Sequence, residues 1–359
     1  MNPLKVIFID DEINKDNTTR IKEILEEEGI FSCTIISPDQ ITQVDELICD
    51  IFITDFELAK VKMTGISFSG NTLSTEYRNR YPNTPIVLLT EQGVFSSRSK
   101  AIRTDNTDLD LIWYKSDVAN KPEEFLRQMK GLANGFVALA NENNNSRTWN
   151  ALLHLLNATE RELQELRETN SPIQRDRWII PEIAEWIRHV IIEYPGVLLD
   201  SHHAAVHIGM DPDDFSRDMD LMKLFEPAKY TGIFHEFGQR WWRRQFIDIA
   251  SDLILTQNIS KPLLEAFVPA FNKAFVKQTR HAVCIWDDTT IADSICFIEN
   301  KPVKSRNSVL YRPDNRPAYM EQARVSRQAI THSNNFDEFL VDPDSADIAD
   351  HWIEMAQEG

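Results

Sequence analysis

The sequence of 359 residues has few cysteines, no long apolar run and no excess of positive charge, and each absence narrows its class. The four cysteines, Cys33, Cys49, Cys284 and Cys296, lie far apart without a CxxC pair, which argues against a disulfide framework and against a zinc site. No stretch approaches 18 consecutive apolar residues, so no membrane span is predicted. The net charge of −18 opposes binding to nucleic acid.

The composition that remains is that of a globular protein with more than one domain. Hydrophobic residues make up 42% of the chain and aromatic residues 9%, which is enough to bury a core. The length predicts two domains, or three. The N-terminal residues lead into an acidic strand end and not into an apolar signal segment, so we expect a cytoplasmic protein.

The first third of the sequence alternates between apolar runs and segments of helical spacing. Residues 5–10 are a continuous apolar run that ends in acid, which is typical of a parallel strand buried on both faces. Residues 17–28 have helical spacing and stop at Gly29, a natural helix end. Four more strands are expected at residues 31–36, 48–54, 84–90 and 109–114, followed by a helix at 122–132. This order predicts an α/β fold with a doubly wound, parallel, five-stranded sheet.

Polar side chains stand at the ends of four predicted strands. Asp10 and Asp11 end the first strand, Asp55 follows the third, Thr90 closes the fourth and Lys115 follows the fifth. Because parallel strands present their carboxyl ends at one edge of the sheet, we expect these side chains to converge in one crevice. Clustered carboxylates repel one another, and a hard cation such as Mg²⁺ relieves that repulsion. A lysine and a hydroxyl beside them favour phosphoryl transfer to a carboxylate.

With these residues in this order, residues 4–130 resemble the receiver domain of response regulators, which has a flavodoxin-like fold. The motifs that carry the resemblance are the acidic pair, the acceptor after DIFIT, the threonine closing IVLLT and the lysine closing LIWYK. The resemblance implies that Thr90 turns toward the phosphoryl group and that Lys115 pairs with it.

The same resemblance implies the other roles at the site. Asp55 would accept a phosphoryl group from the phosphohistidine of a sensor histidine kinase or phosphotransfer protein, in a two-component phosphorelay. Asp11 and Asp55 would bind Mg²⁺ directly, Asp10 through water, and Glu57 through its backbone carbonyl.

Three features depart from the family pattern. The segment between Asp55 and Gly65 is longer than usual and lacks the customary proline. Ser116 follows the lysine where the family has a proline in a cis bond, and Ile112 occupies the place of the switch aromatic. We therefore expect the acceptance chemistry to be retained and the threonine–aromatic relay to differ. The alternative is a receiver that keeps the fold without the chemistry.

Residues 136–170 are expected to be a linker helix. A polar tract at 141–146 predicts an interruption or hinge. After it, apolar residues recur at alternating spacings of three and four over residues 149–166, as in the seam of a coiled coil. Two interpretations follow: a homodimer through 149–166, or an amphipathic helix packed on its own domain.

The remaining part, residues 171–359, is predicted to be mostly helical with a few short strands, and it resembles no family that we recognise. Helices are expected at 178–194, 201–210, 239–255 and 263–277, and strands at 282–286 and 294–298. The Arg240–Arg244 segment, with two tryptophans between cations, is expected to lie on a helix and to anchor those tryptophans in the protein core; the alternative is that they stack on bases or bind a phosphorylated ligand.

Two groups of residues in this part are candidate binding sites. Basic residues outnumber acidic ones over 301–327, so Arg306, Arg312 and Arg316 are candidates for an anion or partner surface. His203 and His207 have the i, i+4 spacing of metal ligands, but no HExxH glutamate lies between them, and ordinary helix histidines are the simpler interpretation.

These observations predict a receiver domain over residues 1–135, a linker helix over 136–170 and an α-rich effector or interaction domain over 171–359. The predicted function is Mg²⁺-dependent phosphoryl acceptance on Asp55, with output through protein contacts or with none, as a phosphoryl sink. Two alternatives remain: a transcription regulator with an unrecognised DNA-binding domain, and an enzyme output domain. No catalytic output motif is recognised.

Overall fold

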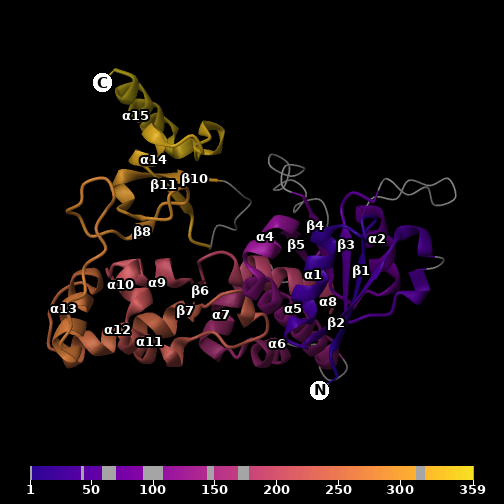
Figure 1. The fold of residues 1–359 in the computed structure, drawn as a ribbon. Helices are drawn as coiled ribbons and strands as arrows, with labels where there is room; N and C mark the ends of the chain where they lie inside the picture. Colours follow the sequence, from indigo (N-terminus) through magenta and orange to yellow (C-terminus); the bar gives the residue numbers. More distant parts are fainter. Residues whose placement is uncertain are drawn as a thin grey trace. The chain divides into compact units, whose positions relative to one another are not determined.

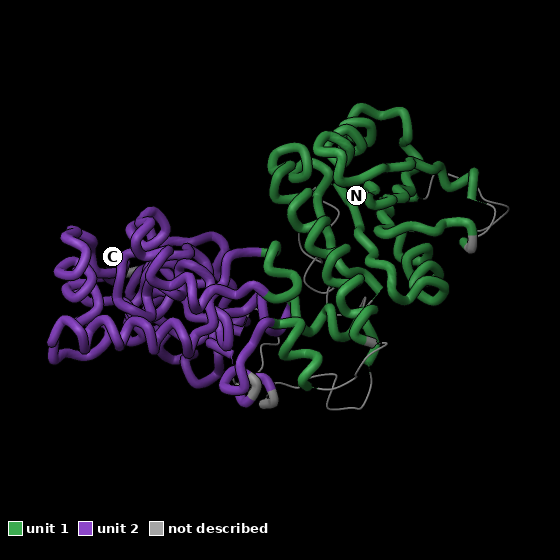
Figure 2. Tube along the Cα trace, turned by 90° about the horizontal axis from the view of Figure 1, so that it is seen from below, with its two compact units in different colours: residues 1–156, 170–188, 232–237 green, residues 157–169, 189–231, 238–359 purple. Residues whose placement is uncertain are grey.

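The chain divides into two compact units, each assembled from separate stretches of sequence (Figure 2). Unit 1 comprises residues 1–156, 170–188 and 232–237, and unit 2 comprises residues 157–169, 189–231 and 238–359. The computed structural model describes residues 2–41, 44–58, 70–91, 108–143, 149–168, 178–312 and 320–358.

Unit 1 is built on a five-stranded sheet with the strand order β2-β1-β3-β4-β5, in which every pair is parallel (Figure 1). Its strands are β1 (Leu4–Ile9), β2 (Phe31–Ile36), β3 (Ile51–Asp55), β4 (Ile86–Thr90) and β5 (Leu111–Tyr114). This is the strand order of the flavodoxin-like doubly wound fold, so the predicted fold class is confirmed.

The apolar runs form strands because both faces of the sheet are covered. Phe8, Phe52 and Leu88 are completely buried, as a parallel sheet between helices requires. The helices that follow the strands are α1 (Asp16–Glu27), α2 (Gly70–Arg80), α4 (Lys115–Asn120) and α5 (Pro122–Asn143). Helix α1 stops before Gly29, which has a φ of 66°. Helix α5 runs past its predicted end at residue 132 and into the polar tract.

The predicted seam over residues 149–166 is two helices, α6 (Trp149–Leu156) and α7 (Glu160–Glu168), and not one. Asn157 between them adopts a φ of 49°, and the backbone N–H of Thr159 donates to the Glu162 side chain at 2.9 Å, which starts α7 anew. Leu152 and Leu156 are fully buried within the single chain. The single continuous helix predicted over 149–166 is therefore wrong, while a homodimer through this segment stays a prediction.

Two later stretches of sequence complete unit 1. The first contains α8 (Ile180–Glu185) and the start of a π-helical segment, η4 (Trp186–Ile192), so the helix predicted over 178–194 changes its winding at Trp186. The second contains the 3₁₀ turn η6 (His235–Phe237). In the first stretch, the Trp178 indole N–H donates to the carbonyl of Leu139 on α5 at 3.2 Å, which ties this stretch to α5.

The helical part of unit 2 surrounds an aromatic core that includes Phe215, Phe225 and Phe246. Its helices are α9 (Ser201–His207), α10 (Pro212–Arg217), α11 (Met219–Leu224), α12 (Arg243–Thr256) and α13 (Leu263–Phe275). The two tryptophans expected on a helix instead form strand β7 (Trp241–Trp242), which pairs antiparallel with β6 (Leu198–Leu199). Both are buried, as expected, because tertiary pairing decides the backbone while burial follows the apolar side chain.

The last part of unit 2 packs short strands against two helices around a second core that contains Val309, Val325 and Trp352. Its elements are β8 (Ser294–Ile295), β9 (Pro302–Val303), β10 (Ser308–Tyr311), β11 (Ala323–Ser326), α14 (Arg327–His332) and α15 (Ala346–Glu358). Within the described ranges of both units, no helix has the length and apolarity needed to cross a membrane.

Candidate phosphoryl-acceptor site

Three carboxylates converge at the carboxyl edge of the sheet in unit 1. Asp10 and Asp11 follow β1, and Asp55 is the last residue of the neighbouring strand β3. Each offers an oxygen atom, and these oxygens lie within 4.8 Å of one another. Oxygen donors gathered in this way fit a hard divalent cation such as Mg²⁺, and they are the one candidate metal group among the residues that the structure describes.

Lys115 joins this group from the end of β5. Its Nζ lies 3.0 Å from Asp10 Oδ2 and 3.1 Å from Asp55 Oδ2, and its side chain is 3% exposed. Burial disfavours the charged ammonium, but the charges of Asp55 and Asp10 outweigh that effect and raise the pKa of Lys115 above its ordinary value. The lysine is therefore a fixed cation between the two carboxylates.

The Asp55 carboxyl is the titrating group of the site. Burial raises its pKa to about 6; Lys115 acts in the opposite direction, and the charge of Asp10 adds to the rise. The backbone N–H of Phe56 donates to Asp55 Oδ1 at 2.8 Å and so orients the carboxyl group. A carboxylate held in one orientation beside a cation is suited to act as a nucleophile.

Two residues that the sequence did not single out hold Asp10 in place. The Thr18 hydroxyl, on α1, donates to Asp10 Oδ2 at 3.0 Å, and the backbone N–H of Glu12 donates to Asp10 Oδ1 at 2.8 Å. Thr18 is fully buried. The sequence feature that could have identified it is the position of a threonine on the inner face of the predicted helix.

Thr90 ends β4, beside Asp55. The backbone N–H of Phe56 donates to the carbonyl of Leu89, so Thr90 stands next to the end of β3. Thr90 is 1% exposed, and its Oγ1 has no hydrogen-bond partner among the described residues. A buried hydroxyl without a partner is costly, and an oxygen-rich ligand at the site would satisfy it.

Two further predictions concern the rim of the site. Glu57 is exposed, two residues beyond Asp55, and the role of its carbonyl in metal binding stays a prediction. Gly65 lies outside the described residues.

The family departures at Lys115 have structural counterparts. Lys115 is the first residue of α4, which also contains Ser116, and the described peptide bonds are all trans. The indole of Trp113 donates to Gln128 Oε1 at 3.1 Å and packs edge-on against Phe125, both on α5. Trp113, one of the two aromatic residues of β5, is thus held by α5.

Gly70 makes a close backbone approach to Asp55. Its N–H donates to the carbonyl of Phe56 at 3.1 Å, where α2 begins. A Cβ atom at this position would lie 2.1 Å from the Asp55 carbonyl oxygen, far inside van der Waals contact. Only glycine fits between the start of α2 and the end of β3.

We predict that Gly70→Ala lowers the free energy of unfolding of unit 1 by about 1–3 kcal/mol, because the added methyl group overlaps backbone that has little room to move. Calorimetric unfolding of the full chain measures the change. Glu76→Ala, at an exposed position of the same helix, is the matched control and should unfold like the wild type. Equal stability of the two variants would show that the α2–β3 approach is not tight.

The predicted basic surface belongs to unit 2. The Arg306 guanidinium donates to Thr290 Oγ1 at 2.8 Å and lies 3.7 Å from Asp287. Arg312 pairs with Asp342, with 2.5 Å between Nε and Oδ2. Arg316 lies outside the described residues. Two of the three candidate arginines thus have acidic partners within unit 2, and their role as an anion or partner surface stays a prediction.

The two histidines of metal-ligand spacing point to different partners. His203 Nδ1 lies 2.9 Å from Asp200 Oδ2, and His207 hydrogen-bonds to Glu321. Asp200 also caps α9 by accepting from the backbone N–H of His203. This geometry is that of two separate histidine–carboxylate pairs.

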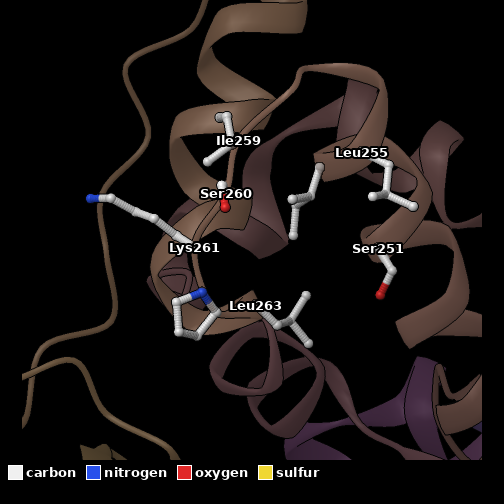
Figure 3. Close-up of a pocket in the computed structure, with 8 residues that line it drawn as sticks. Ser251, Leu255, Ile259, Ser260, Lys261 and Leu263 are labelled. Atoms are coloured by element: carbon white, nitrogen blue, oxygen red, sulfur yellow. The ribbon is translucent and has the colours of Figure 1, made fainter.

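A hollow in unit 2, between the end of α12 and the start of α13, has a volume of about 590 Å³. Figure 3 shows Leu255, Ile259 and Leu263 in its walls, with the Lys261 side chain directed away from the others. The lining contains no carboxylate, histidine or cysteine, so it offers no acid–base pair and no metal ligands.

Neither a protein-family model nor a curated protein matches the sequence. Solved structures similar to the chain include a signal receiver domain of an HD domain-containing protein from Pseudomonas fluorescens Pf-5, with 14% identity, a TM-score of 0.31, and coverage of 41% of this chain and 96% of that one. A CheY-like receiver domain protein from Methanospirillum hungatei JF-1 has 16% identity and a TM-score of 0.27, covering 36% of this chain and 97% of its own.

A third similar structure is the response regulator protein TrrA from Thermotoga maritima in complex with Mg²⁺ and BeF. It has 24% identity and a TM-score of 0.23, and it covers 31% of this chain and 85% of that one. At these scores the receiver fold of the N-terminal segment rests on the strand order and register of the sheet itself.

Proposed function

We propose that unit 1 accepts a phosphoryl group on Asp55 in a two-component signalling system, from a sensor histidine kinase or a phosphotransfer protein. The observation that carries the proposal is the position of Lys115 Nζ, 3.0 Å from Asp10 and 3.1 Å from Asp55, at the strand edge where the Thr90 hydroxyl has no partner among the described residues. An acceptor carboxylate, a fixed cation and a free hydroxyl at one strand edge are the groups that phosphoryl transfer to an aspartate requires.

The transfer forms a bond between Asp55 and phosphorus and breaks the bond between phosphorus and the donor imidazole nitrogen, which leaves with its electron pair. Asp10, Asp11 and Asp55 would hold Mg²⁺, which neutralises charge on the phosphoryl oxygens when it is bound. Lys115 exchanges its contact with the Asp55 oxygen for a phosphoryl oxygen, and Thr90 donates its hydroxyl hydrogen to another.

The output proposed for residues 171–359 is contact with other proteins. A phosphoryl sink, which drains a kinase and transmits little, is the second candidate. It is favoured by the hydrogen bond between Trp113 and Gln128, because that bond ties one of the two aromatic residues of β5 to a neighbouring helix.

The test is Mg²⁺-dependent labelling of the full chain with radioactive acetyl phosphate. We expect the wild type to be labelled and Asp55→Asn to fall to background, because the amide cannot form the acyl phosphate. Asp50→Asn is the matched control, since Asp50 precedes the same strand at its other end and should retain labelling. Undiminished labelling of Asp55→Asn would remove Asp55 from its role.

A further inference from the structure

A second buried charged cluster lies at the opposite edge of the same sheet. Asp110, immediately before β5, is 4% exposed and is hydrogen-bonded by Arg78 of α2. Arg188, also 4% exposed, donates to the carbonyl of Asp110 and places its Nη2 3.8 Å from Asp110 Oδ1. Burying three charges is expensive unless they satisfy one another, so this cluster specifies one arrangement of the elements that bring them together.

The elements that meet at Asp110 are those that build the acceptor site at their other ends. Helix α2 starts against the Asp55 backbone and carries Arg78 in its last turn. Strand β4 ends at Thr90, and its first N–H, that of Ile86, donates to Asp110 Oδ2 at 2.7 Å. Strand β5 leads in four residues from Asp110 to Lys115. These are short regular elements in a close-packed unit, so a displacement at one end reaches the other.

Arg188 connects this cluster to the places where the chain leaves unit 1. It is the last residue of the stretch 170–188, and the chain continues in unit 2 from residue 189. The Arg188 guanidinium carbon lies 5.7 Å from the ring centre of Phe237, which is the last residue of the other late stretch, 232–237. Two of the points at which the chain passes into unit 2 therefore meet at one side chain.

We infer that the Asp110–Arg188 contact carries the phosphorylation state of Asp55 to the second unit. The inference rests on the proposed function. The acyl phosphate carries a charge of about −1.5 to −2 in place of the single charge of the Asp55 carboxylate, and Lys115 must share its hydrogen bonds differently once that group is present. The displacement passes along β5 and α2 to Asp110 and changes the contact between Asp110 and Arg188. That change shifts the equilibrium between arrangements of the segment that begins at residue 189. This route does not use Trp113.

The experiment is hydrogen exchange of the full chain with and without Mg²⁺ and acetyl phosphate, read at the amides of residues 189–231. In the wild type we expect labelling to change exchange there by about fivefold or more, the lower end of typical coupling between sites. In Arg188→Met we expect labelling of Asp55 to stay within about twofold of the wild type while the exchange response disappears. Arg161→Met removes an exposed ion pair with Asp248 within unit 2 and should keep the response.

Each outcome decides the matter. If the wild type is labelled without an exchange response, or if the response persists in Arg188→Met, the inference is overturned and phosphoryl acceptance stands. If the wild type is not labelled, the proposed function is overturned and the inference with it. If Arg188→Met does not fold, Arg188→Lys replaces it. Lysine keeps the charge but lacks the planar guanidinium that contacts both the carboxylate and the carbonyl of Asp110.

Discussion

Lys115→Met is expected to lower the free energy of unfolding of unit 1 by about 3–5 kcal/mol at pH 7 in metal-free buffer. The substitution removes the cation that lies 3.0 Å from Asp10 and 3.1 Å from Asp55, and it leaves two buried carboxylates facing each other. Calorimetry of the full chain measures the loss as a lower transition temperature. The two units need not unfold together, so the change is read on the transition that responds to the variant.

Added Mg²⁺ should restore much of this stability, because the cation replaces the charge that Lys115 supplied. Acidification should act in the same direction, since protonation of Asp55 removes one of the facing charges. Lys130→Met, at an exposed position on α5, is the matched control and should leave the transition unchanged. A Lys115→Met protein as stable as the wild type, and indifferent to Mg²⁺, would contradict the bridging role.

The second large effect is a stability difference that grows with pH. In metal-free buffer, the free energy of unfolding of Asp55→Asn relative to that of the wild type should rise by about 2–3 kcal/mol between pH 4 and pH 7. The reason is that the pKa of Asp55 rises from 3.8 to about 6 on folding. Between these two values the folded wild type still holds the proton that the unfolded chain has lost. Its stability therefore falls as the pH rises through this window. The asparagine has no proton to lose.

Denaturant titrations of both proteins from pH 4 to pH 7, with a chelator present, measure this difference. Mg²⁺ should reverse it at pH 7 by stabilising the ionised wild-type site, which the asparagine binds more weakly. Asp50→Asn changes the same residue type before the same strand and should show no such growth. If the difference in free energy of unfolding between Asp55→Asn and the wild type stays constant with pH, ionisation of Asp55 does not destabilise the folded protein.

The sheet and its polar edge were predictable because both follow from local features. Continuous apolar runs define buried parallel strands. A polar residue at the end of such a run lies at the carboxyl edge of the sheet, where the other strands also end. Asp10, Asp55 and Lys115 meet for that reason. Gly70 escaped notice because its constraint comes from backbone 15 residues away in sequence, which composition and spacing do not reveal.

Elsewhere the sequence was ambiguous because tertiary packing made the choice. The Arg240–Arg244 segment has an apolar centre that suits either a helix or a buried strand. Its pairing with β6 makes Trp241 and Trp242 a strand. The seam after residue 149 has the right spacing, but Asn157 adopts a conformation that ends α6. The Asp110–Arg188 contact joins residues 78 positions apart, and no periodicity predicts it.

The discontinuous sequence of unit 1 has a consequence for how the protein is made. Its final stretch, residues 232–237, is synthesised about 120 residues after the last strand of its sheet, and residues of unit 2 emerge from the ribosome in between. Unit 1 is therefore complete only after part of unit 2 has been synthesised. A gene fusion that carries residues 1–156 alone would leave out two stretches that belong to unit 1.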